Sequence, residues 1–330
     1  MKFVLTVFCV SFFIAGISTA QEAMPAEKAG SIGPASGKIA FIRNGDIWQM
    51  DVSGQNQDKV CASLNADGRL SWAPDNKTIT FTRSGLVNYS SPDNLGGKHK
   101  LYDLFICYLD SAYANNRNYW FRITNDLGNR GPEWQVSSNR IMFWKDMNAN
   151  LINSEAPNYQ ICTMEPDGSN VELLRKDWQQ FHEDYLISPS QNSNGDIAAV
   201  FLNKSRQVGL VVIPNGKIMS DLDSLLTEAE KHPGMVAPCW SPDNKWIAYI
   251  SNDLKKGGLY ITSPDFKENY IVSTPPVGTY MNTFSPSFSP DSKWLTYSTT
   301  DGSIWIVDIQ GNGKRRLTGP GPDKAPTWSK

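Results

Sequence analysis

One stretch decides the fold: residues 240–249, which read Trp-Ser-Pro-Asp-Asn-Lys-Trp-Ile-Ala-Tyr. Close copies stand at 71–81 (Ser-Trp-Ala-Pro-Asp-Asn-Lys-Thr-Ile-Thr-Phe) and at 288–297 (Phe-Ser-Pro-Asp-Ser-Lys-Trp-Leu-Thr-Tyr). Proline presets one backbone angle, and Asp and Asn side chains satisfy nearby amides, so each Pro-Asp is typical of a tight turn. The alternating residues that follow predict a buried strand. Each copy is therefore a strand, a turn and a second strand.

The number and ends of the repeats predict a closed ring. Weaker copies occur at 134–143 and 187–201, and a last copy begins at 326–330, which gives six units of roughly 49 residues over 37–330. Strand sequences such as Asp-Ile-Trp at 46–48 and Ser-Ile-Trp at 303–305 follow the copies. The region opens on the second strand of a unit and finishes on the first strand of a unit. We predict an all-β, six-bladed β-propeller of four-stranded antiparallel blades, in which the C-terminal strand joins the N-terminal blade.

An aromatic residue recurs once per unit, at positions 72, 134, 240, 288 and 328. We predict that these rings pack between neighbouring blades; the alternative is a ligand cage. The Ser-Pro-Asp turns are predicted to be structural.

The N-terminus and the charge indicate an exported protein that does not bind nucleic acid. Residues 1–20 combine Lys2, an apolar run and Ser-Thr-Ala, which is typical of a cleaved signal peptide. Residues 21–36 read as a flexible lead-in to a propeller over 37–330. With 31 Lys+Arg against 33 Asp+Glu there is no basic excess to neutralise phosphates. No later segment is long and apolar enough to insert into a membrane, so we expect a periplasmic or secreted monomer.

Cysteine usage leaves two alternatives open. Cys61, Cys107, Cys162 and Cys239 remain beyond the leader, and all lie in apolar strand patterns. An oxidising compartment permits disulfides, but these spacings match no disulfide framework. The pattern favours buried free thiols.

The repeat at 240–249, followed by Gly-Leu-Tyr-Ile at 258–261, resembles that of the TolB family of periplasmic propeller proteins. The resemblance covers 37–330. It implies a six-bladed propeller that binds other proteins of the bacterial cell envelope, notably a peptidoglycan-associated lipoprotein, without catalysing a reaction. TolB carries an α/β domain before its propeller, whereas only 21–36 occupy that place here.

Catalytic motifs are sparse. There is no Gly-x-Ser-x-Gly elbow, His-Glu-x-x-His pair or phosphate-binding glycine loop. The most concentrated polar chemistry is His182-Glu183-Asp184, which reads either as a solvated loop or as a general base or metal ligand. The alternative to a binding protein is a metal-assisted lactonase or a glycan-cleaving enzyme.

The long inserts predict where a partner binds. They fall on the face that carries the connections between blades, opposite the short Ser-Pro-Asp turns, and long loops on a rigid scaffold commonly carry function. Residues 221–231 read as a short amphipathic helix on the rim. The candidate binding residues on this long-loop face are Trp178, Phe181, His182, Asp184, Tyr280, Asp126 and Arg130.

No cofactor is expected, with one exception. Asp146, Asn148 and Asn150 alternate oxygen ligands as a calcium loop does, although the Gly and the terminal Glu of a complete loop are missing.

Overall fold

The computed structural model describes residues 37–89, 97–109, 119–149, 158–174, 185–203, 205, 207–216, 230–251, 253, 257–282 and 285–330. In chain order its first strands are β1 (Lys38–Arg43), β2 (Asp46–Asp51), β3 (Asp58–Cys61), β4 (Ala66–Trp72), β5 (Thr78–Tyr89), β6 (Gly97–Tyr108), β7 (Trp120–Arg122), β8 (Asn129–Trp134), β9 (Ile141–Asp146), β10 (Tyr159–Met164), β11 (Glu172–Leu173) and β12 (Tyr185–Gln191). The remaining strands are β13 (Ile197–Leu202), β14 (Val208–Ile213), β15 (Met235–Trp240), β16 (Ile247–Ser251), β17 (Gly258–Thr262), β18 (Asn269–Ser273), β19 (Ser287–Phe288), β20 (Trp294–Ser298), β21 (Ile304–Asp308), β22 (Arg315–Arg316) and β23 (Lys324–Trp328).

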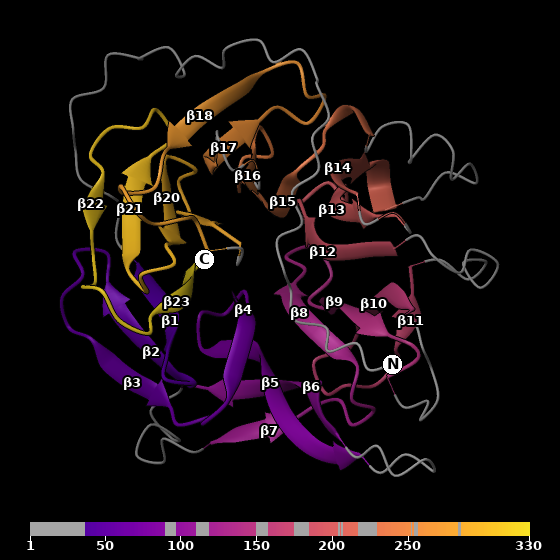
Figure 1. The fold of residues 1–330 in the computed structure, drawn as a ribbon. Coiled ribbons are helices and arrows are strands. Elements are labelled where there is room, and N and C mark those ends of the chain that lie inside the picture. The colour runs from indigo at the N-terminus through magenta and orange to yellow at the C-terminus, as the bar shows by residue number, and fades with distance from the viewer. Residues whose placement is uncertain are drawn as a thin grey trace.

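These strands form six antiparallel sheets arranged as blades around a central channel (Figure 1). Blade 1 contains β23, β1, β2 and β3, and the others follow in order: β4–β7, β8–β11, β12–β14, β15–β18 and β19–β22. Blade 4 shows three strands within the described residues; 217–229, which include most of the predicted rim helix, lie outside them. The predicted six-bladed, all-β propeller is confirmed.

The ring closes as predicted. β23 pairs antiparallel with β1, with Trp328 opposite Ile39. Beyond the strand, the Ser329 N–H donates to the carbonyl of Lys38 at 2.8 Å, and the Lys38 N–H donates to the Ser329 hydroxyl at 3.0 Å. Closure removes the open sheet edges that a linear stack of blades would expose.

The Ser-Pro-Asp turns use their own side chains. The Ser241 hydroxyl donates to Asp243 at 2.6 Å and accepts the backbone N–H of Trp246 at 2.9 Å. Asn244 takes a positive φ of 62°, which Asn tolerates better than most residues. These groups are therefore used in closing the hairpin.

The recurring aromatic residues pack between blades, as predicted. Trp72 shares a core cluster with Ala40 and Ile42 of blade 1, and Trp134 shares one with Leu104 and Ile106 of blade 2. The same holds for Trp240 against blade 4, Phe288 against blade 5 and Trp328 against blade 6. In blade 4 the equivalent position, opposite Ile197 at the end of β12, is Gln191.

All four cysteines of the propeller are free thiols in the structure; Cys61, Cys107 and Cys162 are buried and Cys239 is half-buried. In the described part of the chain no helix is long and apolar enough to cross a bilayer.

Candidate functional site

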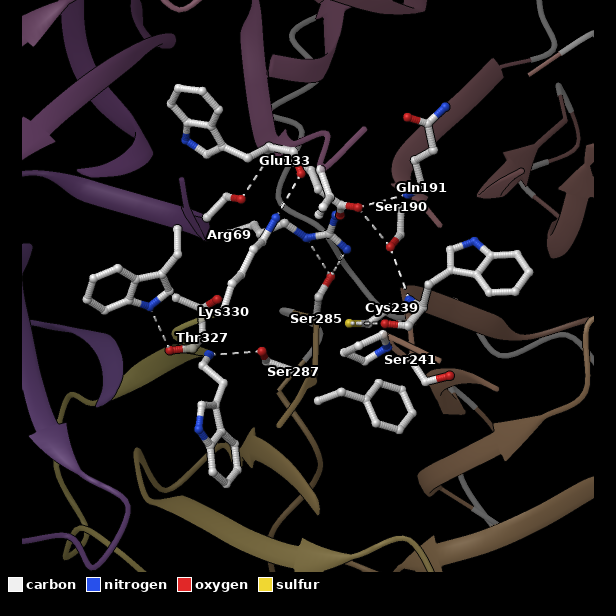
Figure 2. Close-up of a pocket in the computed structure, with 18 of the residues that line it drawn as sticks. Arg69, Glu133, Ser190, Gln191, Cys239, Ser241, Ser285, Ser287, Thr327 and Lys330 are labelled. Carbon is white, nitrogen blue, oxygen red and sulfur yellow. Dashed lines mark hydrogen bonds and ion pairs between the residues drawn. The ribbon is translucent and has the colours of Figure 1, made fainter. Parts of the chain in front are cut away.

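A cavity of about 360 Å³ occupies the central channel at the end formed by the short hairpin turns. We call it the funnel. Its wall consists of the innermost strands of the six blades, shown in Figure 2, and its floor is formed by Arg69 and Glu133. The rim comprises Pro74, Val136, Ser193, Asn244, Pro290 and Lys330.

A repeated β-bulge shapes the wall. In four inner strands the bulge holds a residue with positive φ followed by proline: Gly131-Pro132, Ser188-Pro189, Ala237-Pro238 and Ala325-Pro326. Proline fits a bulge because it has no N–H for the ladder. The carbonyls of two of these prolines, Pro189 and Pro238, accept hydrogen bonds in the channel instead of pairing within the sheet.

Blade 2 departs from this pattern. In β4 the bulge holds Gly68 and Arg69, both lacking a partner residue on β5, and Leu70 stands where four other blades have proline in the bulge. Gly68 has a φ of 76°, a conformation glycine adopts without strain. Arg69 stands three residues before the aromatic position and sends a long cationic side chain into the channel, whereas the other blades have Gly, Ser or Ala at the same position.

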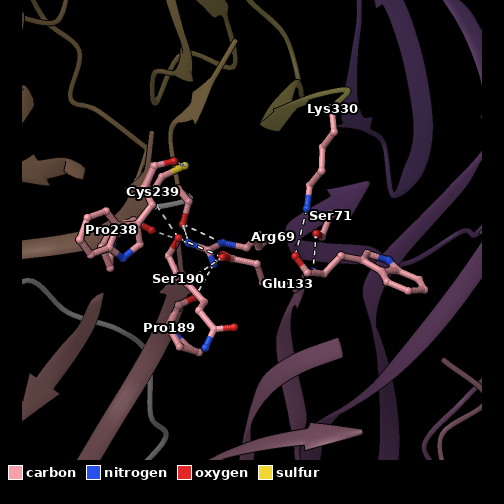
Figure 3. A network of polar contacts seen from close by, with 12 residues as sticks. Arg69, Ser71, Glu133, Pro189, Ser190, Pro238, Cys239 and Lys330 are labelled. Carbon is pink, nitrogen blue, oxygen red and sulfur yellow. Dashed lines mark hydrogen bonds and ion pairs between the residues drawn. The ribbon is translucent and has the colours of Figure 1, made fainter. Parts of the chain in front are cut away.

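The Arg69 guanidinium links four other blades across the channel (Figure 3). It pairs with the Glu133 carboxylate of blade 3, and Nη1 donates to the carbonyl of Pro189 at 2.6 Å. Nη2 donates to the carbonyl of Pro238 at 2.6 Å, and Nε donates to the Ser285 hydroxyl at 2.9 Å. The planar, five-donor guanidinium suits this divergent set of acceptors. Arg69 therefore spans the channel and closes the bottom of the funnel.

A set of hydrogen bonds, the inner ring, joins successive blades around the funnel. At four junctions the side chain just before the aromatic position accepts the backbone N–H at the aromatic position of the next blade. The pairs are Ser71 with Trp134 at 2.9 Å, Glu133 with Gln191 at 2.8 Å, Ser190 with Trp240 at 3.2 Å, and Ser287 with Trp328 at 2.9 Å. Glu133 also accepts the Ser190 hydroxyl at 3.0 Å, so its carboxylate serves both the ring and Arg69.

Lys330 adds a second cation. Its ammonium donates to the carbonyl of Trp134 at 3.0 Å, and its backbone N–H donates to Asn76 at 2.7 Å. Although Lys330 as a residue is exposed, its ammonium is desolvated in the funnel; this lowers the pKa of Lys330, against the opposing attraction of Glu133 and Cys239. Arg69, Lys330 and Glu133 are the charged side chains among the lining residues, and Arg69 is paired with Glu133.

Three predicted binding residues are described, and none lines the funnel. Asp126 pairs with Lys145 and accepts a hydrogen bond from Asn129; burial raises the pKa of Asp126, but these two partners outweigh it and the pKa lies below its usual value. Arg130 stacks over the ring of Tyr102 at 3.7 Å, and Tyr280 is 60% exposed. The binding role assigned to the three residues from the sequence stays a prediction.

Most of the other predicted site residues lie outside the described residues. Trp178, Phe181, His182 and Asp184 lie outside the described residues, as does Asn150 of the calcium prediction. One oxygen of Asp146 accepts the backbone N–H groups of Asn148 at 3.0 Å and Asn158 at 2.9 Å. Within the described ranges no cluster of three or more His, Cys, Asp or Glu could hold a metal. Calcium binding stays a prediction.

Sequence reasoning missed Arg69, Glu133 and Lys330. The available signal was a broken repeat: proline stands two residues before the aromatic position at 132, 189, 238, 286 and 326, but leucine stands there at 70. Likewise, a glutamate at 133 replaces the small residue found at 71, 190, 239, 287 and 327.

Known proteins resemble this chain in fold and not in sequence. No protein-family model matches the chain, and no curated protein matches its sequence. Among solved structures, TolB from Acinetobacter baumannii superposes with a TM-score of 0.61 at 18% identity, over 89% of this chain and 66% of that chain. The chain thus spans just under two thirds of that TolB.

Two further solved structures superpose on most of this chain. A chain of the nidogen/laminin complex gives a TM-score of 0.61 at 10% identity, over 89% of this chain and 98% of that one. A protein assigned as TolB from Agrobacterium tumefaciens gives 0.55 at 13% identity, over 86% and 89%. At sequence identities this low, the superpositions establish a shared architecture and no more. The chain has the TolB-like six-bladed β-propeller fold.

Proposed function

We propose that this chain is a non-catalytic, protein-binding propeller that receives a segment of a partner protein in the funnel. The observation that carries the proposal is the floor: Arg69 closes the channel with its donors already engaged, which leaves a shaped cavity above it. About 360 Å³ is room for a few side chains of a loop or chain end.

The lining supports a peptide ligand. Tryptophan edges and prolines supply apolar contact, and polar side chains that are hydrogen-bonded within the fold, such as Ser193, Asn244 and Ser329, surround them near the rim. Aromatic contacts surrounded by polar groups are typical of protein interfaces. Because the Lys330 ammonium lies in the lining, we expect the inserted segment to carry a carboxylate or carbonyl acceptors that can reach it.

The lining gives less support to an enzyme. Glu133 is the one side-chain carboxylate among the residues that line the funnel, and it is shared by Arg69, Ser190 and Gln191. General acid–base chemistry on a lactone or a glycan would need a second group free to exchange a proton. The alternative of a metal-assisted lactonase or glycan-cleaving enzyme is tested by assaying such substrates with added calcium or manganese. Turnover that disappears in His182→Ala or Asp184→Ala would overturn the non-catalytic assignment.

The compartment and the partner follow from the resemblance to TolB. A propeller of this fold behind a signal peptide is expected in the periplasm, where a peptidoglycan-associated lipoprotein is the partner class that the resemblance implies. That protein, purified from the same organism, is therefore the probe.

The experiment compares two valines with the same substitution. Val136 lies on the funnel rim and is 59% exposed, whereas Val277 is fully exposed and lies in the connection between blades 5 and 6, which belongs to the long-loop face. Val136→Asp should weaken binding at least tenfold, because it replaces an apolar contact with the partner by a charge that must be desolvated. Val277→Asp should change the dissociation constant by less than twofold. Neither exposed residue is needed for the fold.

The outcomes separate the two faces. Loss of binding in Val277→Asp alone would overturn the funnel and support the long-loop face predicted from the sequence. No binding by the unmodified chain at ~100 μM lipoprotein would overturn the partner class.

A further inference from the structure

Two cysteines from neighbouring blades meet in one core cluster. Cys61 ends β3, the outermost strand of blade 1, and Cys107 lies on β6 of blade 2. Both are buried, and both belong to the cluster that fills the space between these blades. Cys162 and Cys239 pack in two other clusters.

The contact between the two strands is close. The Cys107 sulfur lies 4.0 Å from the carbonyl oxygen of Val60, the carbonyl bonded to the nitrogen of Cys61. The neighbouring Cys107 thiol and burial in the cluster both raise the pKa of Cys61. Trp120, beside the pair, donates its indole N–H to the carbonyl of Ala62 at 3.3 Å and so holds β7 against the end of β3.

We propose that Cys61 and Cys107 are the site of an inter-blade disulfide, formed when the chain folds in the presence of a disulfide oxidant. The reaction is thiol–disulfide exchange with a small disulfide such as oxidised glutathione. The first thiolate attacks the oxidant and releases one reduced thiol, and the second thiolate attacks the mixed disulfide and releases another. Two cysteine thiols are oxidised, one oxidant disulfide is reduced to two thiols, and the protein loses two hydrogens.

The surroundings determine when this reaction occurs. Only a thiolate attacks, and a buried thiol in an apolar cluster ionises poorly, so the folded, reduced protein should react slowly. During folding both thiols are accessible, and docking of blade 2 on blade 1 then brings them together. The bond would close a loop of about 46 residues. It would also hold blade 2 against blade 1, the blade that contains the closing strand β23.

The experiment refolds the full chain with and without oxidised glutathione. Peptide mapping without reductant should find Cys61 and Cys107 in one cross-linked species that separates on reduction, with an intact mass lower by 2 Da. By the chain-entropy argument, Tm of the oxidised protein should exceed that of the reduced protein by ~5 °C, and a phosphine reductant should abolish the difference. Cys162→Ala and Cys239→Ala should keep the mass change, whereas Cys61→Ala and Cys107→Ala should lose it.

Mapping on the unmodified chain keeps the test valid if a cysteine variant folds poorly. Equal thiol counts in denaturant for the two refolded samples would overturn the proposal. So would a cross-link that joins either cysteine to Cys162 or Cys239.

Discussion

Replacement of Arg69 by methionine tests the role of the channel floor most directly. Arg69→Met preserves most of the aliphatic stem and removes the guanidinium. Four acceptors then lose a donor: the Glu133 carboxylate, the carbonyls of Pro189 and Pro238, and the Ser285 hydroxyl. The variant therefore separates the charge and hydrogen bonds of Arg69 from its bulk.

The expected cost follows from burial. The side chains of Arg69 and Glu133 are 11% and 16% exposed. Removing one partner of a buried ion pair costs about 3–5 kcal/mol, chiefly because the other charge stays buried and unpaired. Water can reach the acceptors from the funnel, and Glu133 keeps two other donors, so we take the lower limit of about 3 kcal/mol. For a folded region of roughly 290 residues this lowers Tm by ~5 °C.

A thermodynamic cycle with Glu133→Gln isolates the pair. The double variant removes both charges, so it should be more stable than the sum of the single changes predicts, by about 1.5 kcal/mol. Urea and thermal unfolding followed by tryptophan fluorescence measure all four proteins. Lys267→Met is the matched control because Lys267 and Asp265 form an exposed pair, and it should not change stability measurably.

Two results would refute the reasoning. If Arg69→Met is no more destabilising than Lys267→Met, the guanidinium does not hold the channel together. If the two single changes simply add, Arg69 and Glu133 are not energetically coupled, and the short contact between them carries no net stabilisation.

Three further predictions test the ring, its inner hydrogen bonds and an ion pair. Deleting residues 325–330 removes most of the closing strand and should lower Tm by more than ~10 °C; an unchanged Tm would contradict closure. Ser71→Ala leaves a backbone N–H of the next blade without its acceptor and should cost about 1–2 kcal/mol by urea unfolding, whereas the exposed Ser137→Ala should cost nothing measurable. Lys145 and Asn129 outweigh burial and lower the pKa of Asp126 in the fold, so its stabilisation is present above the unfolded pKa and lost as the pH falls through the folded one; the Tm deficit of Asp126→Asn at pH 7 should therefore shrink as the pH is lowered below the ordinary range of an Asp carboxyl.

Repetition made the architecture predictable. A Ser-Pro-Asp turn between two strands predicts a hairpin from local sequence alone, because turn geometry depends on the few residues that form it. Five consecutive units, with a sixth split into three strands at the start and one at the end, determine a ring closed by β23 against β1. The aromatic position was assigned correctly for the same reason, since five of the six units bury a large ring there against an adjacent unit.

The channel could not be predicted in this way, because its contacts join units instead of repeating within them. Arg69 meets Glu133 across 64 residues, Pro238 across 169 and Ser285 across 216. Which atoms meet depends on the channel width, on the bulge that turns proline carbonyls inward, and on the displaced bulge that aims Arg69. The proximity of Cys61 to Cys107 has the same origin, since docking between two blades creates it. Local patterning thus determined the blades and their closure, whereas only the assembled ring decided which charged, thiol and carbonyl groups face one another.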